Sequence, residues 1–443
     1  MGVVPDVLTS RRAAAWSAVA GLLLVAVAVV VPHVLEENVQ VNWPPLHADW
    51  DPRIGWLTLP AVVLGIALVV GLPRLVASAS WRAVLALTYG LTWLWTVAVA
   101  MTQGTDGLGR VFERTGEYVY DAQGVKAIGP MLRTFVDHIP MGGTDSWHTH
   151  VAGHPPGALL FFVLLDRLGI TDPFDIGLVV VSIGSSAAVA VVLTLKVLST
   201  ERVARQAVPW IVLAPAVVWM GVSADAMFTG VAAWGLCLLA VATRSGGRRA
   251  VVAAIGAGIL LGVCVYLSYG LLLLGFLALT VLWVGRSWRP LPWALGGALV
   301  VVAVFTASGF SWWEAYPVLR ERYYAGVASE RSYGYWVWAD LAAWTFTVGL
   351  AVWAAFPRAF RAARDGLDPG RTVVARLAAG AVVTIVAATL SGMSKAEVER
   401  IWLPFTIWVV ALPLLLPERW HRPLLASQVV IALLTQTVLL TRW

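Results

Sequence analysis

Charged residues are scarce in this sequence. Asp, Glu, Lys and Arg together make up 13% of its 443 residues, whereas hydrophobic residues make up 59%. A soluble domain carries roughly twice that share of charged residues. The composition therefore excludes an ordinary soluble domain and favours a protein that lies in a membrane.

Cysteine is also rare, and Cys237 and Cys264 both lie inside apolar stretches without metal-binding spacing around them. The sequence therefore indicates neither a disulfide framework nor a thiolate metal site. It also lacks a glycine-rich phosphate-binding motif, which argues against a nucleotide-sugar or ATP domain. The net charge of +6 does not indicate nucleic-acid binding, because the distribution of charge between loops matters more in a membrane protein than its sum.

Apolar stretches of about 20 residues, the length of a membrane-spanning helix, recur along the chain. The sequence predicts an all-α polytopic membrane protein, a bundle of about 13 transmembrane helices. We expect them at 13–33, 57–77, 82–101, 174–197, 207–222, 225–243, 249–267, 269–285, 291–309, 335–356, 375–391, 402–416 and 423–440.

The loops between these spans divide by charge. Those on one side are short and rich in Arg, which marks that side as cytoplasmic and places the N-terminus there, in a bacterial cytoplasmic membrane. This count assumes that the short apolar run 157–165 does not cross the bilayer, because it has about half the required length. If it crossed, every later loop would change sides.

The longer, more acidic loops then face outward, and they suggest three regions. Residues 1–101 form N-terminal helices that include an extra hairpin. Residues 102–173 form an outer catalytic loop with interfacial helices and a re-entrant segment. Residues 174–443 form the remaining bundle, with outer loops at 311–334 and 392–401 that we expect to bind the donor. Ionisable groups beside a membrane are costly, so such clusters are the default place to look for function.

The outer loop 102–173 contains the candidates for acid–base chemistry. Glu117, Tyr118 and Asp121 have helical spacing, which predicts a short interfacial helix with both carboxylates on one face. Such a pair suits general-base catalysis, with Asp106 as an alternative base. His148, His150 and His154 lack the spacing of a helical zinc motif. Instead, the two prolines after His154 predict a rigid turn that fixes its imidazole at the membrane surface.

Two further outer loops carry cations and tyrosines that suit a lipid phosphate. The loop at 311–334 and the helix after it contribute Arg320, Arg322, Arg331, Tyr333 and Tyr335, and the loop at 392–401 contributes Lys395, Glu397 and Arg400. An outward-facing site has no access to cytoplasmic nucleotide sugars. A sugar-transferring enzyme with this topology would therefore need a polyprenyl-phosphate sugar as its donor.

Several short motifs carry a family resemblance: Glu117-Tyr118, the HPPG run at 154–157, SADAMF at 223–228 and EVERIW at 397–402. Their order resembles the GT-C superfamily of polyprenyl-phosphate-sugar glycosyltransferases, in particular actinobacterial transferases of envelope lipoglycan and arabinan assembly such as the methylthioxylose transferase group. The likeness to aminoarabinose transferases and protein mannosyltransferases is more distant. The resemblance implies inverting transfer with Glu117 or Asp121 as the catalytic carboxylate, and Arg331 and Arg400 beside the donor phosphate.

The sequence departs from this family pattern in two places. The catalytic loop of the family follows the first helix, whereas here it follows the third, so Asp49 and Asp51 in the first outer loop compete for the catalytic role. The Lys that commonly precedes Pro-Pro in the family is replaced by His154.

We therefore expect an integral-membrane glycosyltransferase that moves a sugar from a polyprenyl-phosphate donor to an envelope glycan or lipoglycan. Its partners would be that donor, that acceptor and membrane lipids, with no nucleic acid. A divalent cation, Ca²⁺, Mg²⁺ or Mn²⁺, would suit the same carboxylates. A transporter or flippase is the alternative, but it would favour internal repeats and ionisable groups at the membrane midplane, and a non-catalytic assembly subunit is a third reading.

Overall fold

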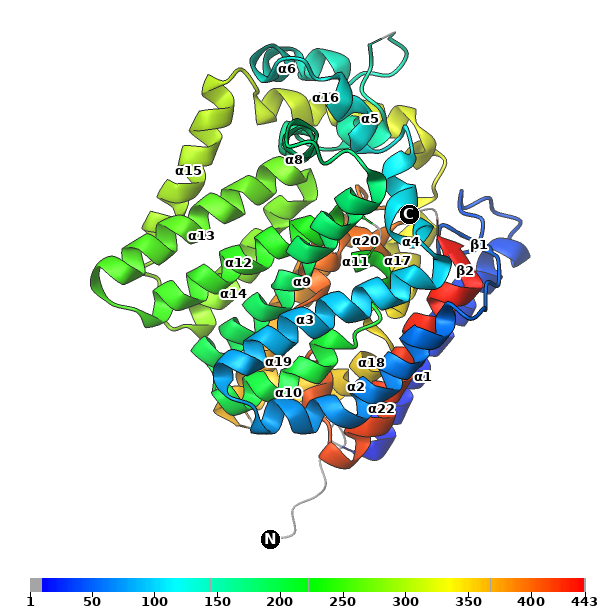
Figure 1. Ribbon diagram of the computed structural model, residues 1–443, viewed down its shortest axis with the longest axis vertical. Coiled ribbons are helices and arrows are strands. Elements are labelled where there is room, and N and C mark those ends of the chain that lie inside the picture. Colours follow the sequence, from blue (N-terminus) through cyan, green and yellow to red (C-terminus); the bar gives the residue numbers. More distant parts are fainter. Residues whose placement is uncertain (1–9, 144, 222, 367, 442–443) are drawn as a thin grey trace.

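The computed structural model describes residues 10–143, 145–221, 223–366 and 368–441. Within these residues nearly all regular structure is helical (Figure 1). A small antiparallel sheet pairs β1 (Ala48–Trp50) with β2 (Leu439–Thr441), with Asp49 opposite Leu440. The protein is therefore an all-α polytopic membrane protein, as predicted.

Seven helices in the described chain are long and apolar enough to cross a membrane. They are α1 (Arg11–Val34), α2 (Thr58–Ser78), α3 (Trp81–Ala100, extended by the 3₁₀ turn η2, Met101–Gln103), α9 (Pro173–Leu198), α12 (Asp225–Arg244), α13 (Gly247–Leu267) and α19 (Pro369–Leu390). Two bent pairs raise the number to nine: α15 (Leu291–Ala307) with α16 (Trp312–Ala325), and α17 (Tyr333–Val348) with α18 (Leu350–Asp365). This is fewer than the expected 13 or so.

Three of the missing spans are interrupted. The stretch 207–222 is divided between α10 (Glu201–Val212) and α11 (Val217–Met220), and 269–285 forms the 3₁₀ turn η5 (Tyr269–Leu273) and α14 (Leu274–Val284). The stretch 402–416 consists of α21 (Leu403–Thr406), turns and η7 (Leu412–Leu415), after α20 (Val398–Ile401). Pro215 lies in the first of these stretches and Pro404 and Pro413 lie in the third, and each lacks the N–H that the interior of a continuous helix requires. The last expected span is α22 (Glu418–Val438), a regular helix that is not among the seven.

The expected span 335–356 is not straight, because α17 and α18 meet at an angle of 107°. Gly349 joins them with a φ of 73°, which favours glycine. A Cβ at this position would overlap the side chain of Gln428 on α22. The turn therefore depends both on the backbone freedom and on the small size of glycine.

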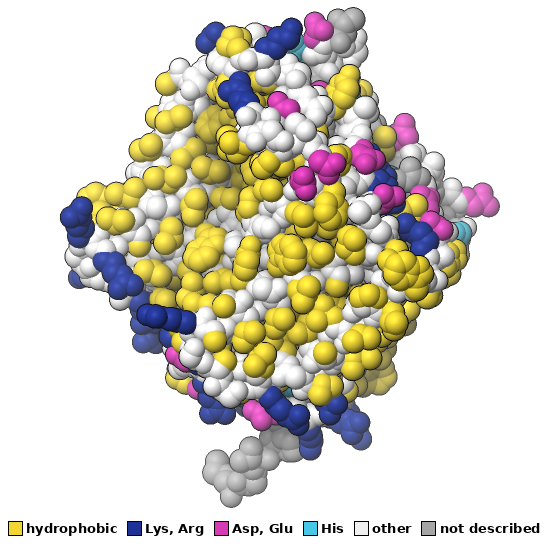
Figure 2. All heavy atoms as spheres, in the orientation of Figure 1, with side chains coloured by type: hydrophobic (Ala, Val, Ile, Leu, Met, Phe, Trp, Pro, Cys, Tyr) yellow, Lys and Arg dark blue, Asp and Glu magenta, His cyan; other side chains and the backbone are white. Residues whose placement is uncertain are grey.

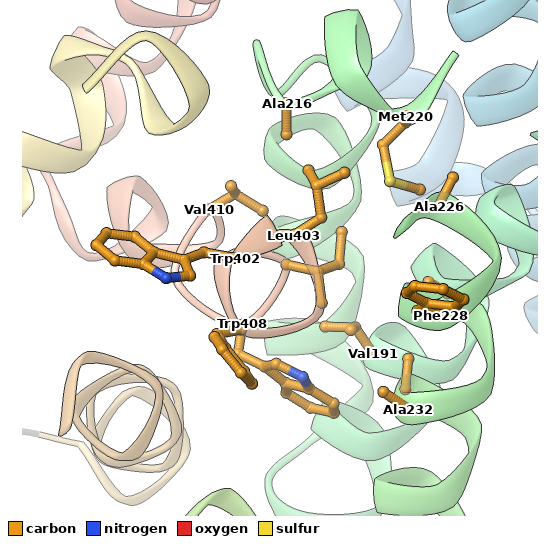
Figure 3. Packing of buried hydrophobic residues seen from close by; sticks show 14 of the residues in the cluster. Val191, Ala216, Met220, Ala226, Phe228, Ala232, Trp402, Leu403, Trp408 and Val410 are labelled. Carbon is orange, nitrogen blue, oxygen red and sulfur yellow. The ribbon is translucent and has the colours of Figure 1, made fainter. Parts of the chain in front are cut away.

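The segment 398–415 lies in the centre of the core rather than against lipid. Figure 3 shows Trp402, Leu403 and Trp408 packed beside residues of α9 and α12, such as Val191 and Phe228. Trp402 and Trp408 are both at most 2% exposed. Their burial lets an irregular backbone persist at membrane depth, because surrounding protein shields it from lipid.

Lipid-facing and polar surfaces separate on the outside of the molecule. Figure 2 shows a broad hydrophobic band, with Lys and Arg concentrated along its lower and lower-left edges and most Asp and Glu at the upper right. Helices α1, α2 and α15 contribute exposed Leu23, Val63, Leu299 and Val304. The chain enters α1 at the lower end of the molecule and reaches β2 at its right edge, near mid-height (Figure 1).

A layer of short helices covers the upper end (Figure 1). Along the chain it consists of α4 (Asp106–Gly109), η3 (Arg110–Glu113), α5 (Tyr118–Gly124), α6 (Ile128–Thr134), η4 (Val136–His138), α7 (Thr149–Gly153) and α8 (Pro156–Arg167), and later α16 and η6 (Val327–Ser329). With 12 residues, α8 is roughly 18 Å long and too short to cross a bilayer. Gly157 at its start touches α13, where a Cβ would overlap the carbonyl of Tyr266.

Candidate active site

A buried ion cluster lies beneath this layer, centred on Arg400 in α20. Its Nη1 lies 2.8 Å from Oδ2 of Asp225, the first residue of α12, and its Nη2 lies 2.8 Å from Oε2 of Glu397. The side chains of Arg400 and Asp225 are 7% and 5% exposed. Buried charges are retained only where partners compensate their desolvation, and here one guanidinium joins two carboxylates.

Glu397 links this cluster to a second cation. Its Oε1 lies 3.4 Å from Nη2 of Arg331, whose Nη1 donates a 2.7 Å hydrogen bond to the carbonyl of Lys395. The Lys395 ammonium in turn donates to the carbonyls of Ala328 and Arg331, at 2.8 and 2.9 Å. The loops 326–332 and 392–397 are therefore held together by two cations. The buried Nε of Arg331 has no hydrogen-bond partner within the described chain.

The backbone that carries Glu397 is strained. Ala396 and Glu397 have φ values of 68° and 63°, a region that residues with a side chain rarely adopt. The N–H of Ala396 is tied to Oδ1 of the buried Asp340, at 3.1 Å, which helps to hold this conformation. Strain of this kind is typical of functional sites, and it aims the Glu397 carboxylate at both arginines.

Glu117 is the carboxylate of this region that is suited to exchange a proton. It occupies the N-cap position of α5 and is 6% exposed. Burial raises its pKa to about 7, although the positive charge of Arg400 acts in the opposite direction. A pKa near neutrality suits a general base, because both protonation states are then accessible.

Two histidines lie beside Glu117. Nε2 of His150 lies 3.2 Å from its Oε1, and the rings of His150 and His154 both face Tyr118, with centroids 6.1 and 5.7 Å away. Burial lowers the pKa of both histidines, that of His150 to about 3, so both are neutral at physiological pH. Nδ1 of His154 lies 3.0 Å from the carbonyl of Leu267, which requires its proton on Nδ1 and leaves Nε2 as an acceptor.

Glu397 contrasts with Glu117 in charge state. Burial alone would raise its pKa, but Arg400 and Arg331 outweigh burial and lower it to about 2. Glu397 is therefore a permanent anion that holds the two arginines. For Glu117, the effect of burial on the pKa exceeds that of the Arg400 charge, so its pKa stays near neutral pH.

Comparison with known proteins adds one distant likeness. A scan against protein-family models and a search of curated proteins find no match. Among solved structures, the chain is similar to the crystal structure of ArnT from Cupriavidus metallidurans in the apo state, at 16% identity and a TM-score of 0.42. The match covers 65% of this chain and 54% of ArnT, so it spans about half of that protein.

The remaining predicted carboxylates lie apart from Arg400. Asp121 pairs instead with His148, whose Nδ1 lies 2.7 Å from its Oδ1. Asp49 accepts a 2.5 Å hydrogen bond from Asn42, next to the β1–β2 pair, and Asp51 forms an ion pair with Arg53 at 3.3 Å. Asp106 is exposed at the start of α4. The structure thus brings Glu117, but none of these four, to the ion cluster.

The predicted donor-binding residues divide in the same way. Arg331, Lys395, Glu397 and Arg400 belong to the cluster. Arg322 lies in α16, within the layer of short helices, and donates hydrogen bonds to backbone carbonyls of the same layer. Its Nη1 lies 2.5 Å from the carbonyl of Ile139, and its Nη2 lies 2.9 Å from that of Trp147. Arg320 is exposed. The other two are tyrosines: Tyr333 donates to the carbonyl of Leu390, and the buried Tyr335 donates to that of Ala28 in α1.

Sequence reasoning did not assign Asp225, His150 or Arg114 to the site. Asp225 was marked only by being an acid at the start of an apolar run, within the SADAMF motif, and that is the signal that would have identified it. For His150 the sequence suggests only a zinc ligand, and its spacing to His148 and His154 does not match a helical zinc motif. Arg114 acts on the charge of Glu117, but nothing in its local sequence predicts this. Among the described residues, no three His, Cys, Asp or Glu side chains are grouped to hold a metal ion.

Proposed function

We propose that this protein is a GT-C-type glycosyltransferase of the bacterial cytoplasmic membrane, with its active site on the outer face. It moves a sugar from a polyprenyl-phosphate donor to an envelope glycan or lipoglycan. The observation that carries this proposal is Glu117, a buried carboxylate with a pKa of about 7 beside a fixed cluster of arginines. Such a pairing suits transfer to a hydroxyl with loss of an anionic phosphate.

The proposed reaction is a single inverting displacement. Glu117 takes the proton of the acceptor hydroxyl, whose oxygen forms a bond to the anomeric carbon of the donor. The bond between that carbon and the phosphate oxygen breaks, and the electron pair leaves with the polyprenyl phosphate. No covalent enzyme intermediate is needed, because one base and one leaving-group site account for all atoms.

Arg331 is the residue we assign to the leaving phosphate. Its Nη atoms are engaged by Glu397 and the carbonyl of Lys395, whereas its buried Nε has no partner within the described chain. Arg400 differs from Arg331 in having its charge compensated by two carboxylates, Asp225 and Glu397, whereas Arg331 shares Glu397 with it. We therefore assign Arg400 a positioning role, which sets the local charge without itself contacting the phosphate. We also assign Lys395 and His154 to the proposed phosphate site, where they add a positive charge and a neutral imidazole.

The distribution of polar residues supports a lipid-linked donor. The ion cluster on α20 lies in the interior, below the short helices at the upper end (Figure 1), and away from the Arg-rich lower edge, which the positive-inside rule assigns to the cytoplasm (Figure 2). Nucleotide sugars are confined to the cytoplasm, so a donor used here has to have crossed the membrane on a lipid carrier. Exposed apolar residues of α15 and α16, such as Leu299, Val304 and Trp313, offer that lipid an apolar surface.

The decisive experiment measures transfer of labelled sugar from a panel of synthetic polyprenyl-phosphate sugars to envelope glycan acceptors. Wild type is compared with Glu117→Gln and, as a matched control, Glu113→Gln, which changes an exposed carboxylate four residues earlier in the same loop. Transfer by wild type and by the control, but not by Glu117→Gln, supports the proposal. Absence of transfer with every donor in well-folded protein would overturn it and favour transport.

A further inference from the structure

A cavity of about 300 Å³ opens in the outer layer, separate from the ion cluster. It lies between α5, α6 and the segment that leads into α7, and its wall includes Tyr120, Asp121, Lys126, His138 and Trp147. Aromatic faces, a carboxylate, an ammonium and an imidazole thus surround one space. Its volume is at the lower end of the range for small-molecule pockets, with room for one or two sugar rings.

The polar wall of this cavity is held in place before any ligand binds. Asp121 accepts from both Nδ1 and the backbone N–H of His148, at 2.7 and 3.1 Å. Its carboxylate is therefore fixed at two points, while each oxygen keeps a further lone pair. A preset acceptor of this kind binds a ligand hydroxyl without first losing side-chain entropy.

The aromatic wall is equally constrained. The Trp147 indole donates a 3.0 Å hydrogen bond to the carbonyl of Phe135 and packs against the Phe135 ring, with centroids 5.4 Å apart. Arg322 also holds this part of the wall in place, because its Nη2 donates a 2.9 Å hydrogen bond to the Trp147 carbonyl. Tyr120 is 58% exposed, and its ring meets that of His148 at 82°. An exposed, oriented aromatic ring suits the apolar face of a sugar.

We propose that this cavity binds a neutral sugar residue of the acceptor glycan, stacked on the Tyr120 and Trp147 rings with its hydroxyls hydrogen bonded to Asp121 and Lys126. The inference rests on the proposed function for the identity of the ligand as an acceptor. Of the described residues that line the cavity, Asp121 alone carries a carboxylate, and a phosphate entering the cavity would meet its negative charge. Sugar hydroxyls, in contrast, both donate to a carboxylate and accept from an ammonium.

The position of the cavity fits this role. Asp121 lies four residues after Glu117, the N-cap of α5, which corresponds to a rise of roughly 6 Å along the helix axis, about the length of one sugar ring. His148 and His150, two residues apart, contact Asp121 and Glu117 respectively. A glycan held at Asp121 therefore has its next residue beside Glu117, where the acceptor hydroxyl has to lie.

The test measures binding without turnover. Purified full-length protein in nanodiscs is titrated with neutral trisaccharides, mannotriose and arabinotriose, by isothermal titration calorimetry in the absence of donor. Wild type is compared with Tyr120→Ala, Lys126→Gln and, as a control, Trp56→Ala, which removes an exposed aromatic ring from the first outer loop. We expect at least one trisaccharide to bind, Tyr120→Ala to weaken it about fivefold to tenfold, and Trp56→Ala to leave it unchanged.

Binding that is the same in wild type, Tyr120→Ala and Lys126→Gln would overturn the inference, as would tighter binding of inorganic phosphate than of either sugar at this site. Failure of wild type to bind either trisaccharide also counts against it. These outcomes are distinct from failure of the proposed function. Cavity-dependent sugar binding without transfer would reject the enzyme but keep the site, whereas transfer with an acceptor KM unaffected by Tyr120→Ala would reject the site but keep the enzyme.

Discussion

Two carboxylate–histidine pairs are built on Glu117, the N-cap of α5, and on Asp121, four residues later in that helix, and they differ in their surroundings. Glu117 pairs with His150 close to the charge of Arg400, whereas Asp121 lines the cavity and pairs with His148. The side chains of Glu117 and Asp121 are each 8% exposed, but that of His148 is 39% exposed and that of His150 only 15%. Burial raises the pKa of Glu117 to about 7 and lowers that of His150 to about 3. Environment, rather than residue type, thus makes one pair suited to proton transfer and the other to binding.

The largest expected difference between the pairs is in transfer rate. Glu117→Gln removes the base and lowers kcat/KM by about 10²- to 10⁴-fold. Asp121→Asn preserves an acceptor oxygen at the cavity, so we expect a few-fold rise in acceptor KM with little change in kcat. Steady-state transfer assays in membranes measure both. Equal losses of kcat in the two variants would erase the distinction between the pairs.

Stability distinguishes the two environments next. Arg400→Gln leaves Asp225 and Glu397 buried without their shared cation, which we expect to cost about 3–5 kcal/mol of unfolding free energy. Arg320→Gln removes an exposed arginine from α16 and should change it by less than about 0.5 kcal/mol. Denaturant unfolding in a fixed detergent provides the comparison. If the two variants were equally stable, the ion cluster would not support the fold.

We expect the pKa of Glu117 to set the pH dependence of transfer. Below a pH of about 7 Glu117 becomes protonated and ceases to act as a base, so kcat/KM falls about tenfold per pH unit, and above that pH it levels off. Asp121→Asn should retain the wild-type profile. A profile that is flat between pH 5 and pH 8, or that changes in Asp121→Asn, would contradict the assignment of the base.

The smallest expected effects concern the two histidines. His150→Ala removes a polar group 3.2 Å from the Glu117 carboxylate, which disfavours the ionised form and moves the midpoint of the pH profile upward. His148→Ala frees Asp121 and should raise the acceptor KM without moving that midpoint. The comparison uses kcat/KM and KM measured across pH. If the midpoint of the pH profile moved in His148→Ala and not in His150→Ala, Asp121 rather than Glu117 would be the base.

The fold and the site differ in how far the sequence could predict them. Hydrophobic length located α1, α2, α3, α9, α12, α13 and α19 within a few residues, because a helix facing lipid has to be continuous and apolar. The same criterion overcounted at 398–415, where apolar chain is buried in protein. It also overcounted at 269–284, where a 3₁₀ turn and an 11-residue helix with exposed Leu272 and Trp283 replace a full-length span. Buried apolar segments are free to bend or break, and hydrophobicity alone does not reveal this.

The polar residues of the candidate site could also be predicted only in part from the sequence. Glu117, Arg331, Glu397 and Arg400 stood out as ionisable residues at helix ends in an apolar chain, and the structure places them in one region. Their partners came from far along the chain: Asp225 lies 175 residues before Arg400, and Asp340 fixes the strained Ala396. Local spacing predicts which side chains share a helical turn, but contacts across such distances arise only from packing.

The β1–β2 pair has a consequence for the timing of assembly in the cell. During synthesis β1 emerges early, but its partner is made roughly 390 residues later, a delay on the order of 20 to 80 seconds at 5–20 residues per second. Until then the backbone groups of Asp49 and its neighbours have no strand to pair with. The loop that contains β1 is therefore among the last parts of the protein to acquire its native structure, after the helices between the two strands have been inserted.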